Sequence, residues 1–251
     1  MTGGIRLTPQ IALVGSGEIN LSEACDSHVY LVDVGGPLVM IDAGAGLAPE
    51  RIEANIRSLG YSLEQISHLL LTHGHADHAG GAAHFKARRP SLHLCAGRLT
   101  ASFLSAGDER AIALDAARRA GVYPPDYRLR PVEVSRPLDD GEGLQVGVCE
   151  IQVIATPGHS ADSTCYRVAF ADGAALFCGD TLFLSGLLPL LNTHDSDLAA
   201  YRHSLGKLAA LPVEGLYPGH GLFMVRGGSA AVRQQYERLE RSIYLPPVLN
   251  G

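Results

Sequence analysis

The segment LLLTHGHADHAGG, residues 69–81, places four metal-ligand side chains within a span of six residues: His73, His75, Asp77 and His78. Neutral imidazoles and carboxylates are the usual protein ligands of zinc, iron and manganese. The apolar run at 66–72 is typical of a buried strand. Extended residues two apart point the same way, so His73 and His75 can converge where this strand ends. We expect Asp77 and His78 on the first turn of a helix that reaches the same space, and the spacing therefore predicts a metal cluster.

Three later turns carry further ligand-type side chains. The segments ATPGHS (155–160) and LYPGHG (216–221) each end an apolar strand with Pro-Gly-His, and FCGDT (177–181) ends one with Asp180. Proline fixes φ and glycine permits a sharp turn, so His159 and His220 are expected beyond the strand ends. Each turn alone is a weak signal, but together with the cluster they indicate additional ligands.

Composition and charge exclude several classes of protein. The chain has 251 residues, 46% hydrophobic and 18% charged, which is typical of a globular protein with a sizeable core. Its net charge of −6 argues against a nucleic-acid partner. No apolar run reaches membrane-spanning length, and the first residues lack a basic segment followed by an apolar one, so we expect a cytoplasmic protein without a membrane partner.

The cysteines fit a reducing compartment. They are odd in number, scattered and without a C-x-x-C pair, which favours free and mostly buried thiols: Cys25, Cys95, Cys149, Cys165 and Cys178.

Hydrophobic periodicity predicts the elements that must position the ligands. Strands are expected in 28–44 (a hairpin turning at Gly35-Gly36), 66–72, 92–97, 144–156, 164–180 (turning at 172–173) and 214–218. Helices are expected at 49–61, from the His cluster through 89, within 98–126, at 197–211 with Ser196 as N-cap, and at 229–244. Both halves run strands, helix, strand, helix, which predicts a mixed α/β layered domain and suggests a distant duplication.

The order H-x-H-x-D-H, then separate His, Asp and His at later strand ends, with IDAG after the early hairpin, resembles the metallo-β-lactamase superfamily of hydrolases. The resemblance implies an α/β fold, a four-layer αββα sandwich of two mixed β-sheets with helices on the outer faces. It implies a single domain over 1–251, with 98–126 as the counterpart of a helical insertion found in lactonases of this superfamily.

Carried over residue by residue, the resemblance assigns the metal ligands. His73, His75 and His159 form a first site, and Asp180 bridges to a second site formed by Asp77, His78 and His220. Asp42, in IDAG, is expected to support the ligands without binding metal; the alternative is a simple turn-capping role.

This resemblance implies two divalent metal ions, with zinc the first expectation and iron or manganese as alternatives. Metal binding lowers the pKa of a water from about 15.7 towards roughly 7, which gives a hydroxide nucleophile at neutral pH. Asp77 is the expected catalytic carboxylate, orienting the hydroxide and passing its proton to the leaving group. The predicted function is hydrolysis of a small carbonyl substrate: an ester, a thioester or a lactone.

Comparison with branches of the superfamily leaves the substrate open. True β-lactamases are exported and normally lack the bridging Asp. Type II glyoxalases share Asp180 and CGDTLF but add a helical domain that recognises glutathione, whereas 31 residues follow His220 here. N-acyl homoserine lactonases carry tyrosine where this chain has Phe183. The alternatives are a mononuclear-iron persulfide dioxygenase that uses His73, His159 and Asp180, and a non-catalytic metal-binding protein.

The apolar stretch 182–191, LFLSGLLPLL, follows Asp180 directly. We expect Phe183, Leu187 and Leu190 to line a pocket for an acyl chain of a small-molecule substrate. The alternatives are core packing, a lid, or a contact within a homodimer.

Overall fold

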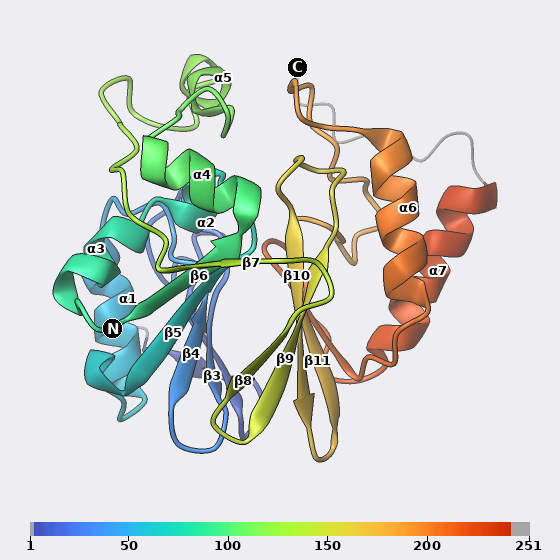
Figure 1. Ribbon diagram of the computed structural model, residues 1–251, viewed down its shortest axis with the longest axis horizontal. Coiled ribbons are helices and arrows are strands. Elements are labelled where there is room, and N and C mark those ends of the chain that lie inside the picture. Colours follow the sequence, from blue (N-terminus) through green and yellow to red (C-terminus); the bar gives the residue numbers. More distant parts are fainter. Residues whose placement is uncertain (1–2, 242–251) are drawn as a thin grey trace. The chain divides into compact units, whose positions relative to one another are not determined.

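The computed structural model describes residues 3–241, which form two compact units (Figure 1). The first unit extends to Leu138 and includes Val146–Val148, and the second comprises Asp139–Gln145 and the chain from Cys149 onwards. Within the described residues, no helix has the length and apolar character needed to cross a membrane.

The first unit is built on a seven-stranded mixed sheet whose strands follow one another in sequence order. They are β1 (Ile5–Arg6), β2 (Ile11–Gly15), β3 (Val29–Asp33), β4 (Leu38–Ile41), β5 (Ile66–Leu71), β6 (His93–Gly97) and β7 (Arg136–Leu138). Neighbours from β1 to β4 are antiparallel, and those from β4 to β7 are parallel. The predicted 28–44 hairpin is confirmed as β3 and β4, and the predicted strands at 66–72 and 92–97 are confirmed as β5 and β6.

The parallel pair β4 and β5 brings the ligand-bearing segments together. Ile41 lies opposite Leu70, so Asp42 and Thr72 leave the sheet side by side. Both strands are rich in buried apolar residues, as expected for parallel strands in the interior of a sheet.

Among the described residues of this unit, five α-helices and one 3₁₀ turn accompany the sheet. They are α1 (Pro49–Ser58), η1 (Leu63–Gln65), α2 (Ala76–Ala79), α3 (Ala82–Arg88), α4 (Arg98–Ala106) and α5 (Leu114–Arg119). The prediction of one continuous helix after the His cluster is wrong, because the chain breaks at Gly80-Gly81 between α2 and α3. A Cβ on Gly80 would lie 2.4 Å from the Ala45 carbonyl oxygen, and the Gly81 amide donates to Gly44 instead of continuing the helix.

The predicted helical range 98–126 is two short helices separated by turns. Gly107 ends α4 in the left-handed conformation, φ 65°, and residues 108–113 form turns before α5. Strands β1, β2 and β7 were not predicted.

The second unit is built on a five-stranded sheet in the order β12-β11-β10-β9-β8. Its elements are β8 (Gly143–Val146), β9 (Cys149–Ala155), β10 (Thr164–Phe170), β11 (Gly173–Gly179), α6 (Leu198–Ala209), β12 (Gly215–Pro218) and α7 (Gly228–Arg241). The predicted strands and both helices are confirmed within the described residues, and positions 242–244 of the predicted last helix lie outside them. Strands β11 and β12 are parallel, as are β4 and β5 in the first unit.

The predicted N-cap of α6 is wrong by one residue. Asp197, in extended conformation, caps the helix by accepting a hydrogen bond from the Ala200 amide at 2.9 Å. Ser196 instead donates its hydroxyl to the Gly158 carbonyl and accepts from the Leu191 amide. The carboxylate is placed to reach the helix amides, while the serine hydroxyl ties together the turns that precede the helix.

Candidate metal centre

The H-x-H-x-D-H motif forms a tight cluster in the first unit. His73 follows the end of β5, His75 is the residue before α2, and Asp77 and His78 lie on that short helix. The ring of His73 lies 4.6 Å from that of His75 and 4.1 Å from that of His78, measured between centroids. The structure thus brings these side chains together at the strand end where the sequence predicts them.

A chain of hydrogen bonds fixes how two of these imidazoles point. Asp42 Oδ2 lies 2.8 Å from His78 Nδ1 and accepts from the Thr72 hydroxyl at 2.9 Å. Because that hydroxyl donates to Asp42, it accepts from His73 Nδ1, 3.1 Å away. Both rings therefore carry their proton on Nδ1 and present Nε2 as a lone-pair donor, which is the arrangement found behind metal-ligating histidines.

Asp42 is held in place by its backbone as well as its side chain. Its φ is 61°, in the left-handed region, and its amide donates to the Leu70 carbonyl. Its carboxylate also accepts from the Thr72 amide at 2.8 Å, and the residue is buried. This geometry supports the predicted role of Asp42 in orienting a ligand.

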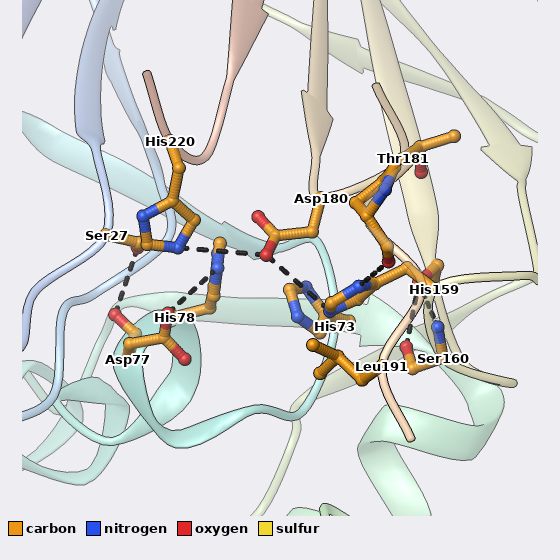
Figure 2. Close-up of polar contacts among 12 residues, drawn as sticks. Ser27, His73, Asp77, His78, His159, Ser160, Asp180, Thr181, Leu191 and His220 are labelled. Atoms are coloured by element: carbon orange, nitrogen blue, oxygen red, sulfur yellow. Dashed lines mark hydrogen bonds and ion pairs between the residues drawn. The ribbon is translucent and has the colours of Figure 1, made fainter. Parts of the chain in front are cut away.

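The second unit gathers His159, Asp180 and His220 from three separate turns (Figure 2). Asp180 Oδ2 lies 3.6 Å from His159 Nε2 and 3.7 Å from His220 Nε2. The Nδ1 of His159 faces the Pro189 carbonyl oxygen, so this ring too presents Nε2. Two imidazole nitrogens thus face one carboxylate oxygen.

Packing at the strand ends positions these turns. The hydroxyls of Thr156, after β9, and Thr181, after β11, are 2.9 Å apart and buried. Gly158 has φ 152°, and a Cβ there would lie 2.5 Å from Tyr201 Cα on α6. The glycine of the Pro-Gly-His turn therefore allows close approach to the helix, and this contact sets the position of His159.

Two side chains that contact Asp77 were not found from the sequence. Ser27 donates its amide and its hydroxyl to the Asp77 carbonyl (Figure 2). Tyr123 donates its hydroxyl to Asp77 Oδ1 at 3.4 Å. Burial, then the charge of Asp77, raises the pKa of Tyr123 far above its usual value, so the phenol stays protonated. No sequence pattern links residues separated by 46 positions, as Tyr123 and Asp77 are.

The apolar stretch 182–191 divides between core and surface. Leu182 and Leu188 are buried in the core of the second unit, and Leu190 packs against that core. Leu187 is 39% exposed, and the Phe183 ring lies 6.0 Å from that of His220. Of the three predicted pocket residues, Phe183 is therefore the one seen against a candidate ligand, and the acyl pocket stays a prediction.

The donor set fits a divalent metal. Five imidazoles and two carboxylates make up the two clusters, and most of these side chains are buried. Nitrogen and oxygen donors of this kind suit zinc, iron and manganese.

Similar proteins are found by sequence. An atrochrysone carboxyl ACP thioesterase of Aspergillus fumigatus is 28% identical over 236 residues, covering 94% of this chain and 63% of that protein. The thioesterase pkgB of Emericella nidulans is 27% identical, covering 87% of this chain and 53% of that protein. The chain thus spans roughly half to two thirds of the length of these curated relatives.

Solved structures share the fold. A metallo-β-lactamase of Cronobacter sakazakii matches with a TM-score of 0.73 at 21% identity, covering 96% of this chain and 97% of that one. BJP-1, a subclass B3 metallo-β-lactamase of Bradyrhizobium japonicum, matches with a TM-score of 0.72 at 22% identity, covering 95% and 91%. The predicted fold class, an α/β metallo-β-lactamase sandwich with two mixed sheets and helices, is confirmed by this likeness.

The family model of the Metallo-beta-lactamase superfamily matches residues 23–220, a range that includes every predicted metal ligand. The chain belongs to the metallo-β-lactamase superfamily.

Proposed function

We propose that this chain is a dinuclear metallohydrolase that cleaves a thioester, with esters and lactones as related substrates. The observation that carries the proposal is the orientation of the imidazoles. His73, His78 and His159 each have Nδ1 against an oxygen of the protein, so that Nε2 is available to a metal. Membership of the superfamily and the thioesterase names of two relatives support the reaction type.

The proposed ligand sets combine the two clusters. His73, His75 and His159 would hold the first metal, and Asp77, His78 and His220 would hold the second. Asp180 would serve both, a role supported by the position of its Oδ2 within 3.7 Å of both His159 Nε2 and His220 Nε2. Zinc is the first expectation from these donors, with iron and manganese as alternatives.

When bound, the metals would polarise the substrate carbonyl and supply a water-derived nucleophile at neutral pH. Among the carboxylates, Asp77 is the one suited to exchange a proton with a substrate. Its side chain is 21% exposed, compared with 9% for Asp180 and 2% for Asp42. Asp42 keeps His78 in one tautomer, and Thr72 does the same for His73.

For the substrate, the thioesterase names of two relatives favour a thioester. We propose that Phe183, beside His220, is the inner wall of an acyl site, with Leu187 and Leu190 further along the stretch. We propose that the segment 98–126 is a helical insertion in a single domain. It would line the substrate site near Asp77, which Tyr123 of this segment contacts. This pocket predicts that kcat/KM rises with acyl length, since each buried CH₂ contributes about 0.8 kcal/mol.

Elemental analysis and turnover test the proposal together. The chain purified without added metal should hold two metals and hydrolyse S-acyl-N-acetylcysteamine thioesters, and a chelator should abolish turnover until metal is restored. His220→Asn should lose metal and activity, while His203→Asn, an exposed position on α6, serves as the matched control. One iron per chain with oxygen uptake on a persulfide would favour the dioxygenase, and bound metal without turnover would favour a binding protein.

A further inference from the structure

The segment that follows α5 sends one side chain to the H-x-H-x-D-H cluster. Tyr123 is 5% exposed, and its hydroxyl donates to Asp77 Oδ1 at 3.4 Å. The other oxygen of the same carboxylate, Oδ2, lies 3.4 Å from His78 Nε2. The two oxygens of Asp77 therefore face different partners.

The backbone beside Tyr123 is anchored on both sides. The Cys25 thiol donates to the Val122 carbonyl oxygen at 3.2 Å, and the Tyr127 hydroxyl donates to the Ala45 carbonyl oxygen at 2.7 Å. The rings of Tyr123 and Tyr127 stack with centroids 4.8 Å apart and planes 20° from parallel. The ring stack and the Cys25–Val122 contact, neither of which needs the Tyr127 hydroxyl, leave the Tyr123 hydroxyl little freedom to move away from Asp77.

Asp77 is also fixed through its backbone. Its carbonyl oxygen accepts the Ser27 hydroxyl at 3.0 Å and the Ser27 amide at 3.3 Å. With the main chain held, the remaining freedom of Asp77 is rotation of its side chain, and the hydrogen bond from Tyr123 restricts that rotation.

We propose that Tyr123 is a positioning residue for Asp77: it holds Oδ1 so that Asp77 offers Oδ2 alone to the metal bound by His78. This inference rests on the proposed function. It assigns to the 98–126 segment a part in the metal centre, through a neutral donor that no ligand motif contains. A phenol hydrogen-bonded to one oxygen also withdraws charge from the carboxylate, which favours binding through one oxygen over two.

Tyr123→Phe tests the proposal because it removes the hydroxyl and keeps the ring stack. Tyr127→Phe is the matched control: it removes the hydroxyl of the stacked partner, which bonds Ala45 and not Asp77. Affinity for Co²⁺ and Zn²⁺ is measured by competition with a chelator, and the d–d absorption of the cobalt protein reports ligand geometry. Thermal unfolding of the metal-free proteins shows whether each variant folds.

We expect Tyr123→Phe to weaken the affinity for one metal, the one that His78 would bind, by about tenfold and to change the cobalt spectrum, because loss of a group that orients a ligand typically has this effect. Tyr127→Phe should lower the unfolding temperature and leave both metal readouts as in the wild type. Equal affinity and an unchanged spectrum in Tyr123→Phe would overturn the proposal, as would an equal change in both variants.

Two further controls separate the possible failures. If the wild type binds no metal, the proposed function fails and this inference fails with it, whereas metal binding that Tyr123→Phe leaves intact overturns only the inference. Should Tyr123→Phe not fold, Tyr123→Met, which also lacks the hydroxyl, is measured in the same way. A double-mutant cycle with Asp77→Ala in metal-free protein should show non-additive effects on stability, and additive effects would contradict the contact.

Discussion

The two ligand clusters are built in different ways. In the first unit, four candidate ligands lie within six consecutive residues, and a charged side chain, Asp42, orients His78. In the second unit, the three candidates come from three separate turns, and a backbone carbonyl, that of Pro189, orients His159. A side-chain carboxylate thus orients a histidine of the first cluster, whereas a main-chain carbonyl orients one of the second, and the two clusters should respond differently to substitution.

Removal of Asp180, the carboxylate that we propose bridges two metals, should have the largest effect. Asp180→Asn loses a negative charge between two candidate cations, so we expect loss of one metal and a fall in kcat/KM of more than about 100-fold. Circular dichroism should show an unchanged fold, and elemental analysis gives the occupancy. A variant that retains both metals and full activity would show that Asp180 does not bridge them.

Substitution of the orienting carboxylate should affect the first cluster selectively. Asp42→Asn keeps a residue that tolerates φ 61° but replaces the acceptor charge behind His78, so metal affinity should fall by about 10- to 100-fold. Chelator competition measures the change. Asp33→Asn, at an exposed hairpin turn where Asp33 accepts from the Gly35 amide, is the control. Equal affinities for the two variants would argue that Asp42 only caps a turn.

The main-chain control of the second cluster predicts a sensitive glycine. Gly158→Ala would force a Cβ to 2.5 Å from Tyr201 Cα, so the free energy of unfolding should fall by about 2–3 kcal/mol. Gly141→Ala, where φ is 80° and no atom lies within 4 Å of the added Cβ, should cost about 1–2 kcal/mol from backbone strain alone. Denaturant unfolding of the metal-free proteins measures the free energy of unfolding of each variant. Equal decreases for the two variants would contradict the proposal that contact with α6 fixes the conformation of the Pro-Gly-His turn.

The smallest expected effect lies in the first unit, away from the ligands. Burial, then the charges of His93 and Arg136, lower the pKa of His68 to about 4. The unfolded chain binds a proton near pH 6.5 and the folded one only near pH 4, so His68 lowers stability as the pH falls through this window. Because the side chain is half exposed, we expect the loss to be about 1 kcal/mol.

Urea unfolding of wild type and His68→Gln between pH 7 and pH 4 measures the contribution of His68. The difference between the two proteins should shrink or reverse in favour of the variant as the pH falls. An identical pH dependence for the two would show that His68 titrates normally.

The contrast between the clusters also explains what the sequence could predict. The H-x-H-x-D-H motif could be predicted as a cluster because its spacing after a buried strand places the side chains close together. The Pro-Gly-His turns could be predicted because proline and glycine mark the ends of the strands. The helix break at Gly80-Gly81 could not be predicted because it depends on the close approach of the Ala45 carbonyl, which is distant in sequence. The sequence could not distinguish Asp197 from Ser196 as the helix cap, because both are polar and only the backbone geometry selects one of them. Tyr123 contacts Asp77 only through tertiary packing, so no local sequence pattern could predict the contact.

The parallel pairing of β11 with β12 has a consequence for the order of folding. Asp180 and His220 meet only after the chain from 181 to 214 has closed a crossover through α6, and such non-local closure is slow. The H-x-H-x-D-H segment needs no such closure, so we expect it to bind a metal ion while the chain is still unfolded. Metal present during refolding should therefore bind first to the histidines of this segment. Because the metal then also binds the unfolded chain, it should stabilise the native state by less than its affinity for the folded protein alone would give.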